Sequence, residues 1–161
     1  MSIPDGFHTV TPYLLIPNHA VQAVAFYQKA FNAQQLLYME TDDRRVVHAE
    51  IKIGNSPVMI GDPTISDDYA PYSGTPHPQI HLLLYVEDVD SFVERAVTAG
   101  AKLIAPVEDQ ISEGDRRGGI EDPFGFVWFV ATQIQPVTRD QLQQAEDKRD
   151  RDSEYYLKQV V

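Results

Sequence analysis

The sequence repeats one pattern of elements along its length. In each half, hydrophobic periodicity indicates a strand, an amphipathic helix and then three strands. A shift of 68 residues aligns apolar positions of the two halves: Leu14-Leu15 with Leu82-Leu83, Val21 with Val89, Val24 with Phe92, and Ala33 with Ala101. A shared order of elements with apolar residues in register is typical of duplication. We therefore predict two tandem βαβββ modules.

The first module is predicted over residues 9–62. A strand at Thr9–Ile16 ends at Pro17, and Asn18 is the expected N-cap of the first helix. That helix is predicted from apolar residues at helical spacing, which include Val21, Val24 and Phe31. Three further strands are predicted, at Gln34–Glu40, Arg45–Ile53 and Pro57–Gly61.

The second module is predicted over residues 79–133, after a linker, residues 63–78, that is rich in Pro, Ser, Asp and Gly. Asp88 is the expected N-cap of its helix, and Gly100 the residue at its end. Its strands are predicted at Gln79–Val86, Lys102–Val107, Glu113–Glu121 and Phe126–Thr132. Residues 134–161 are expected to form a polar helical tail that docks across a dimer partner or frays.

Composition excludes several classes of function. The chain of 161 residues has no cysteine, which excludes disulfides and thiolate metal ligands. Its 24 Asp and Glu against 13 Lys and Arg give a formal net charge of −11, which disfavours nucleic acid and anionic membranes as partners. No apolar run approaches the length of a membrane span, and the N-terminal residues lack the features of a signal peptide. We expect a soluble, cytoplasmic protein.

Alternation along two strands separates a core face from an open face. In the strand predicted at Arg45–Ile53, His48 and Glu50 lie on the open face with Lys52. The opposite face is apolar and is expected to pack on the helix: Val47, Ala49, Ile51 and Ile53. In the strand predicted at Gln79–Val86, the open face holds His81, Leu83 and Tyr85.

Six segments resemble the vicinal oxygen chelate superfamily, and in particular the PhnB-like branch of the glyoxalase/bleomycin-resistance proteins. They are Thr11–Ile16, Ala25–Ala33, His48–Gly54, Tyr85–Asp90, Gly114–Gly119 and Asp122–Gly125. The resemblance implies an α+β fold in which two tandem βαβββ modules form a curved mixed sheet around a cleft, commonly within a homodimer. This scaffold supports several classes of enzyme as well as non-catalytic drug binders, so the resemblance leaves open whether the chain is an enzyme.

Superfamily members that use a metal hold a divalent ion with up to four His, Glu or Gln side chains, on the first and last strands of each module. The corresponding positions here are one of Thr11, Pro12 and Tyr13, then Met59 or Ile60, then His81, and then Phe129. A catalytic divalent ion generally needs three protein donors. The resemblance therefore implies that the usual metal site is largely lost, and no cofactor is expected.

An alternative keeps a metal in a displaced site. His48, Glu50 and His81 are donors that suit Zn²⁺, Mn²⁺ or Ni²⁺. They would serve a glyoxalase-like lyase or isomerase, or another vicinal oxygen chelate enzyme. Without a metal, either histidine has the chemistry of a general base near neutral pH. No catalytic residue is assigned from the sequence.

The function predicted first is the binding of an apolar or mixed small molecule in the cleft. By alternation, Tyr13, Tyr85 and Phe129 share the cleft face, whereas Trp128 faces the core. Arg117 is either a bidentate grip for an anionic ligand or part of a solvated hairpin loop. A third possibility is a cleft filled by side chains, which leaves only an interaction role. The cleft candidates are Tyr13, His48, Glu50, His81, Tyr85, Arg117 and Phe129.

Overall fold

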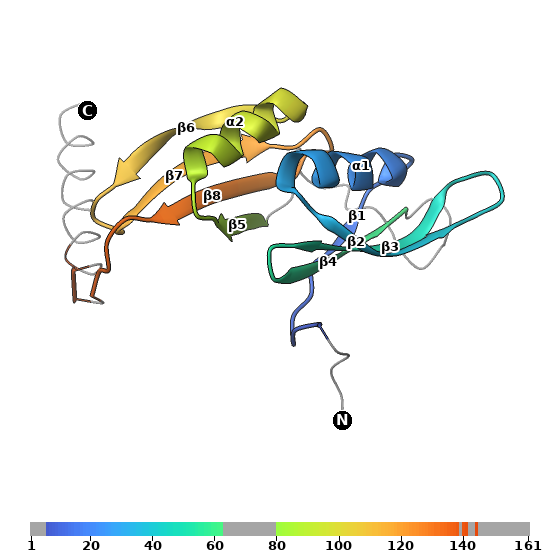
Figure 1. The fold of residues 1–161 in the computed structure, drawn as a ribbon, viewed down its shortest axis with the longest axis horizontal. Coiled ribbons are helices and arrows are strands. Elements are labelled where there is room, and N and C mark those ends of the chain that lie inside the picture. The colour runs from blue at the N-terminus through green and yellow to red at the C-terminus, as the bar shows by residue number, and fades with distance from the viewer. Residues whose placement is uncertain (1–5, 63–79, 139, 142–143, 145–161) are drawn as a thin grey trace, which may run out of the picture.

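Two βαβββ modules follow one another in the computed structural model, which describes residues 6–62, 80–138, 140, 141 and 144. The first module contains β1 (Tyr13–Leu15), α1 (Ala20–Phe31), β2 (Gln34–Glu40), β3 (Val46–Ile53) and β4 (Ser56–Gly61). The second contains β5 (His81–Tyr85), α2 (Val89–Ala99), β6 (Lys102–Gln110), β7 (Asp115–Glu121) and β8 (Val127–Gln133). This order confirms the predicted fold class (Figure 1). The predicted linker and most of the predicted tail lie outside the described residues.

Each module forms one four-stranded mixed sheet. Sheet A has the strand order β1-β4-β3-β2, and sheet B has the order β5-β8-β7-β6. In both sheets the first strand of the module pairs in parallel with the last, and the other neighbours are antiparallel. Equivalent topologies are what a duplication produces. In the described part of the chain, the expected curved sheet is therefore present as two four-stranded sheets.

The helices begin close to the predicted capping residues. Asp88 caps α2 as predicted, because its carboxylate accepts the backbone N–H of Ser91 at 3.2 Å. The prediction for α1 is wrong by one residue, since its N-cap is His19. Asn18 instead has a φ of 60° and donates its backbone N–H to Asp62. Asparagine tolerates this left-handed conformation, so it forms the turn in front of the cap.

One strand residue lies on the opposite face from that predicted. Val47 is predicted to be in the core, but it is 42% exposed, and Val46 is buried instead. The register of β3 with β2 skips Val47, which makes it the extra residue of a β-bulge. A bulge shifts the alternation of side chains by one position, which moves Val47 out and Val46 in. His48 and Glu50 lie beyond the bulge and keep the alternation that was predicted.

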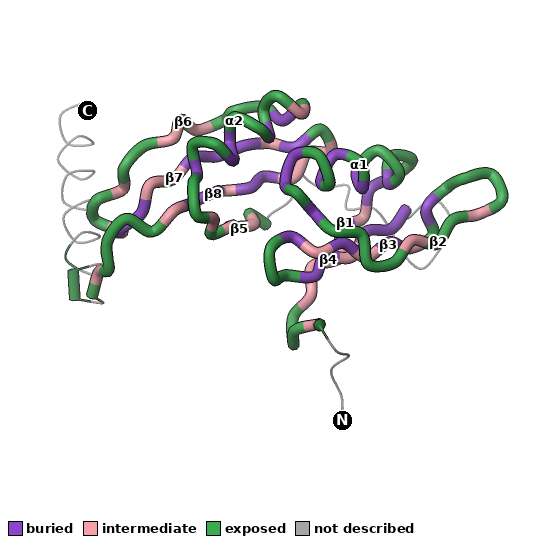
Figure 2. Tube along the Cα trace, viewed as in Figure 1, coloured by how far each residue is buried: buried purple, intermediate pink, exposed green. Residues whose placement is uncertain are grey.

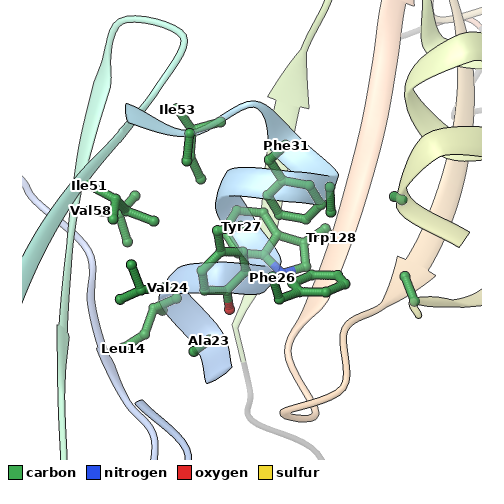
Figure 3. Close-up of a cluster of buried hydrophobic side chains, with 14 of the residues drawn as sticks. Leu14, Ala23, Val24, Phe26, Tyr27, Phe31, Ile51, Ile53, Val58 and Trp128 are labelled. Carbon is green, nitrogen blue, oxygen red and sulfur yellow. The ribbon is translucent and has the colours of Figure 1, made fainter. Parts of the chain in front are cut away.

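An aromatic cluster joins the two modules. Helices α1 and α2 lie side by side (Figure 1). The ring of Phe31 in α1 lies against Phe92 in α2, with centroids 5.3 Å apart, and against Trp128 in β8 at 4.9 Å. Figure 3 shows Trp128 beside Tyr27 and Phe31. Trp128 is 1% exposed, which confirms that it faces the core.

A buried carboxylate holds this junction. Asp122, in the turn before β8, accepts hydrogen bonds from the Tyr27 hydroxyl at 2.6 Å and from the Trp128 indole N–H at 2.8 Å. The backbone N–H groups of Phe124 and Phe126 donate to it at 2.9 and 3.0 Å. Burial raises the pKa of the Asp122 carboxyl, although these donors act in the opposite direction. The turn before β8 is thereby tied to α1 of the other module.

Along β3 buried positions alternate with more exposed ones, and along β5 exposed positions alternate with partly buried ones, so each sheet keeps one more open face (Figure 2). Apolar side chains remain exposed on the strands of both sheets. On sheet A these are Leu36, Leu37, Met39 and Val47, and on sheet B Leu83, Tyr85, Leu103 and Ile104. Neither helix that the structure describes is long and apolar enough to cross a membrane.

Candidate functional site

The predicted site residues are divided between the two sheets. Sheet A carries Tyr13, His48 and Glu50, and sheet B carries His81, Tyr85, Arg117 and Phe129. The division follows from the fold, because the modules join through their helices and each sheet has its own open face. The site therefore has two parts within one chain.

The sheet A residues form a hydrogen-bonded chain. Tyr13 Oη lies 3.1 Å from His48 Nδ1, and His48 Nε2 lies 3.2 Å from Glu50 Oε1. The rings of Tyr13 and His48 meet edge to face, with centroids 5.5 Å apart. The side chains of His48 and Glu50 are 23% and 19% exposed. The side chains of His48 and Glu50 are thus partly shielded from bulk water.

Gly61 makes room for the Tyr13 phenol. In the parallel pairing of β1 with β4, Tyr13 is opposite Met59, two residues before Gly61. A Cβ atom at position 61 would lie 2.7 Å from Tyr13 Oη and 3.0 Å from Tyr13 Cε2. Gly61 is not among the glycines with positive φ, so its backbone conformation does not require glycine. Glycine is required at position 61 because the Tyr13 phenol occupies the space of a side chain there.

Phe129 lines a pocket of about 410 Å³ on sheet B. Its ring lies against Gly119, where a Cβ atom would be 3.2 Å from Phe129 Cε1. Glu108 and Gln110 of β6 add polar groups to the same pocket. The pocket therefore combines an aromatic wall with hydrogen-bonding groups, as small-molecule sites do.

Arg117 reaches this pocket with its charge already paired. Its Nη2 lies 2.7 Å from Glu113 Oε2 and 3.0 Å from Asp115 Oδ2. The Asp115 side chain is only 5% exposed, so this pairing is shielded from solvent. A guanidinium held by two carboxylates has little charge left for an anionic ligand.

His81 and Tyr85 occupy different surroundings on β5. The exposed His81 has its ring 5.4 Å from that of Phe129, beside the sheet B pocket. Tyr85 is 67% exposed and lines a wider groove of about 1400 Å³ between the modules. That groove is bordered by Phe31 at the end of α1 and by Asp88 at the start of α2.

The residues present do not fit the metal centre of those superfamily members that use a metal. Of the corresponding positions, His81 supplies an imidazole, while Met59 or Ile60 and Phe129 supply no hard donor. His48 and Glu50 lie together, but His81 belongs to the other sheet. In the part of the chain that the structure describes, no three His, Asp or Glu side chains are grouped to hold a metal ion.

Sequence reasoning missed Gly61, Gly119 and Asp122 as residues that shape the site. A signal for Gly61 exists once the strand pairing is known. Tyr13 pairs with Met59, and Gly61 follows Met59 by two residues, so it lies on the same face as the Tyr13 ring. No local signal connects Asp122 with Tyr27, because 95 residues separate them. Their contact depends on how the two modules pack.

Comparison with known proteins places the chain in a family. The sequence matches the family model of the Glyoxalase/Bleomycin resistance protein/Dioxygenase superfamily over residues 8–130. The chain belongs to this superfamily, which confirms the resemblance noted from its motifs. An uncharacterised protein of Mycobacterium tuberculosis is 34% identical over 142 residues, which cover 84% of this chain and 81% of that protein.

Solved structures share the fold. The X-ray structure of a gene product of Arabidopsis thaliana is 25% identical, with a TM-score of 0.63, and the match covers 78% of this chain and 98% of that one. A PhnB protein from Bacillus cereus is 18% identical with a TM-score of 0.60, covering 78% of this chain and 99% of that one. At this identity the second likeness concerns the fold alone.

Proposed function

We propose that this chain is a small-molecule binding protein that acts as a homodimer and without the usual metal centre of its superfamily. One observation carries the proposal: Phe129, at a position where metal-using members of the superfamily hold a ligand, lines a pocket of about 410 Å³. Small-molecule sites have volumes of about 300–1,000 Å³ and mostly apolar walls with a few polar groups. The pocket on sheet B has a volume in this range and an aromatic wall at Phe129, but half of its lining residues are polar: Glu108, Gln110, Glu113 and Arg117.

The charges around the pocket favour a neutral or cationic ligand. Glu113 and Asp115 pair with Arg117, so the anion grip considered from the sequence has no spare charge. Glu108, on the rim, adds a further carboxylate. An anionic ligand would meet net negative charge here, in a chain whose formal net charge is −11.

The dimer is proposed because the open faces carry apolar side chains that nothing in the described chain covers. Leu37 and Met39 on sheet A and Leu83 on sheet B are each 39–50% exposed. Strands β1 and β5 also form the edges of their sheets. A second copy of the chain that covers these faces would bury apolar surface and shield the sheet B pocket from solvent.

Three naphthalene probes of similar size test the binding site: neutral 1-naphthalenemethanol, cationic 1-naphthylmethylammonium and anionic 1-naphthoate. The neutral and cationic probes are expected to raise the melting temperature, and the anionic probe is not. Phe129→Ala should abolish the effect, whereas Ile111→Ala, at an exposed residue outside the pocket, should preserve it. Equal responses of both variants would refute the assigned site.

Metal analysis of the untagged protein separates this proposal from the enzyme alternative. The proposed function predicts no stoichiometric metal. Metal that is present at one equivalent and lost in both His48→Ala and His81→Ala would instead establish the displaced site on His48, Glu50 and His81. In that case sheet A and sheet B would have to meet between two copies of the chain.

A further inference from the structure

The hydrogen-bonded chain on sheet A has a defined direction. A carboxylate only accepts hydrogen bonds, so Glu50 fixes the proton of His48 on Nε2. With its proton on Nε2, a neutral imidazole would leave the Nδ1 lone pair facing Tyr13 Oη at 3.1 Å, where it would accept the phenol O–H. The Tyr13 oxygen therefore contacts a base, His48, and the Glu50 carboxylate contacts the other nitrogen of that base. Weak hydroxyl nucleophiles are activated by this kind of arrangement.

The phenol is held on the open face. Leu14 and Ile16 are buried at 5% and 2% exposure, so the side chain of Tyr13 points away from the core. A Cβ atom at position 61 would lie 2.7 Å from Tyr13 Oη, and the backbone of Gly61 does not itself require glycine. The absence of a side chain at Gly61 thus fits the position of the phenol next to His48.

We propose that Tyr13 is the catalytic residue of a proton-transfer site on sheet A, with His48 as the base behind it and Glu50 as the positioning residue. The Tyr13 oxygen takes a proton from a bound substrate while its own proton passes to His48 Nδ1. The substrate becomes its conjugate base, and the imidazolium is balanced by Glu50. The step moves protons only, so it needs no oxidant, reductant or second substrate.

The surroundings define the class of substrate. Glu50 contributes a carboxylate to this group of side chains, so an anionic substrate is disfavoured. The substrate is a neutral molecule with a weakly acidic O–H or C–H group. This activity goes beyond the proposed binding function and does not depend on a ligand in the sheet B pocket.

Benzenesulfonyl fluoride tests the activated phenol without knowledge of the substrate. The Tyr13 oxygen attacks sulfur, the S–F bond breaks, fluoride leaves, and the phenol proton passes to His48. Near neutral pH, Tyr13 is expected to react about tenfold faster than the exposed Tyr85 of the same chain, as measured by peptide mass spectrometry. His48→Gln and Glu50→Gln should lower the rate at Tyr13 to that of Tyr85.

Two further measurements complete the test. Glu94→Gln, at an exposed residue of α2, should leave the rate at Tyr13 unchanged. Nitrogen-15 NMR of the unmodified chain should show His48 protonated on Nε2, and Glu50→Gln should remove this preference. The proposal is overturned if Tyr13 reacts no faster than Tyr85, if its rate survives His48→Gln, or if His48 carries its proton on Nδ1. Because the His48 tautomer is measured on the wild-type chain, this result tests the proposal even if a variant does not fold.

Discussion

Replacement of Tyr27 by phenylalanine would remove one hydroxyl from the junction between the modules and keep the aromatic ring in place. The hydroxyl donates to Asp122 at 2.6 Å, and the two residues are only 0% and 3% exposed. Three donors to the carboxylate remain, from the Trp128 indole and two backbone N–H groups. The variant therefore keeps a buried carboxylate that lacks one of its hydrogen bonds.

A hydrogen bond to a charged group contributes about 1.5–3 kcal/mol to the free energy of unfolding. In a chain of this size, 1 kcal/mol changes the melting temperature by about 2–4 °C, so Tyr27→Phe should lower it by about 3–12 °C. Guanidinium unfolding, followed by Trp128 fluorescence, measures the free energy directly. Tyr38→Phe is the matched control, because its partly exposed hydroxyl makes no hydrogen bond to a described residue, and its cost should stay within about 0.5 kcal/mol.

The size of the loss should depend on pH. Burial raises the pKa of Asp122 in the folded state, so ionisation of this carboxyl costs stability as the pH rises through its folded pKa. Without the Tyr27 hydroxyl the ionised form loses a donor and the folded pKa rises further. The destabilisation should therefore be larger at neutral pH than under acidic conditions that protonate Asp122. A loss below about 0.5 kcal/mol at neutral pH, or an equal loss in both conditions, would refute this role of Asp122.

Other parts of the structure are tested by three further changes. Gly118→Ala would place a Cβ atom 2.7 Å from Val107 Cγ2 in β6, and the resulting shift should cost about 1–3 kcal/mol in chemical denaturation. Arg95→Ala removes the hydrogen bond from Arg95 Nε to the Ala30 carbonyl at 3.0 Å, and a melting curve should show a loss of about 0.5–1.5 kcal/mol. Leu83→Lys adds a charge to the open face of sheet B and should convert the proposed dimer to a monomer in native mass spectrometry. A dimer that persists in Leu83→Lys would contradict the proposed interface.

Much of the fold could be predicted because its signals extend over whole elements. Repeated apolar spacing identified both modules, and the side chain of Asp88 identified the start of α2. The errors occur where one residue changes the local geometry. Val47 lies in a bulge that no periodicity reveals, and Asn18 adopts the left-handed turn before the cap.

The candidate site was less accessible to sequence reasoning, because its geometry depends on contacts between strands. Alternation placed His48 and Glu50 on one face, but their hydrogen-bonded link to Tyr13 requires β1 to run beside β4. Tyr85 and Phe129 were expected on one cleft face. The register of β5 with β8 keeps them on one face of sheet B, because Leu83, on the same face as Tyr85, is opposite Phe129. They border different hollows, however.

The junction at Asp122 makes the two repeats dependent on each other. The residue 68 positions before Asp122 is Gly54, so the carboxylate that joins the modules occurs in one repeat only. Tyr27 and Phe31 come from the first repeat, and Trp128 comes from the second. Each half has a complete βαβββ pattern, yet separation would expose the aromatic faces of both. We therefore expect that neither half folds stably on its own, and that a single ancestral module would have needed self-association to bury that face.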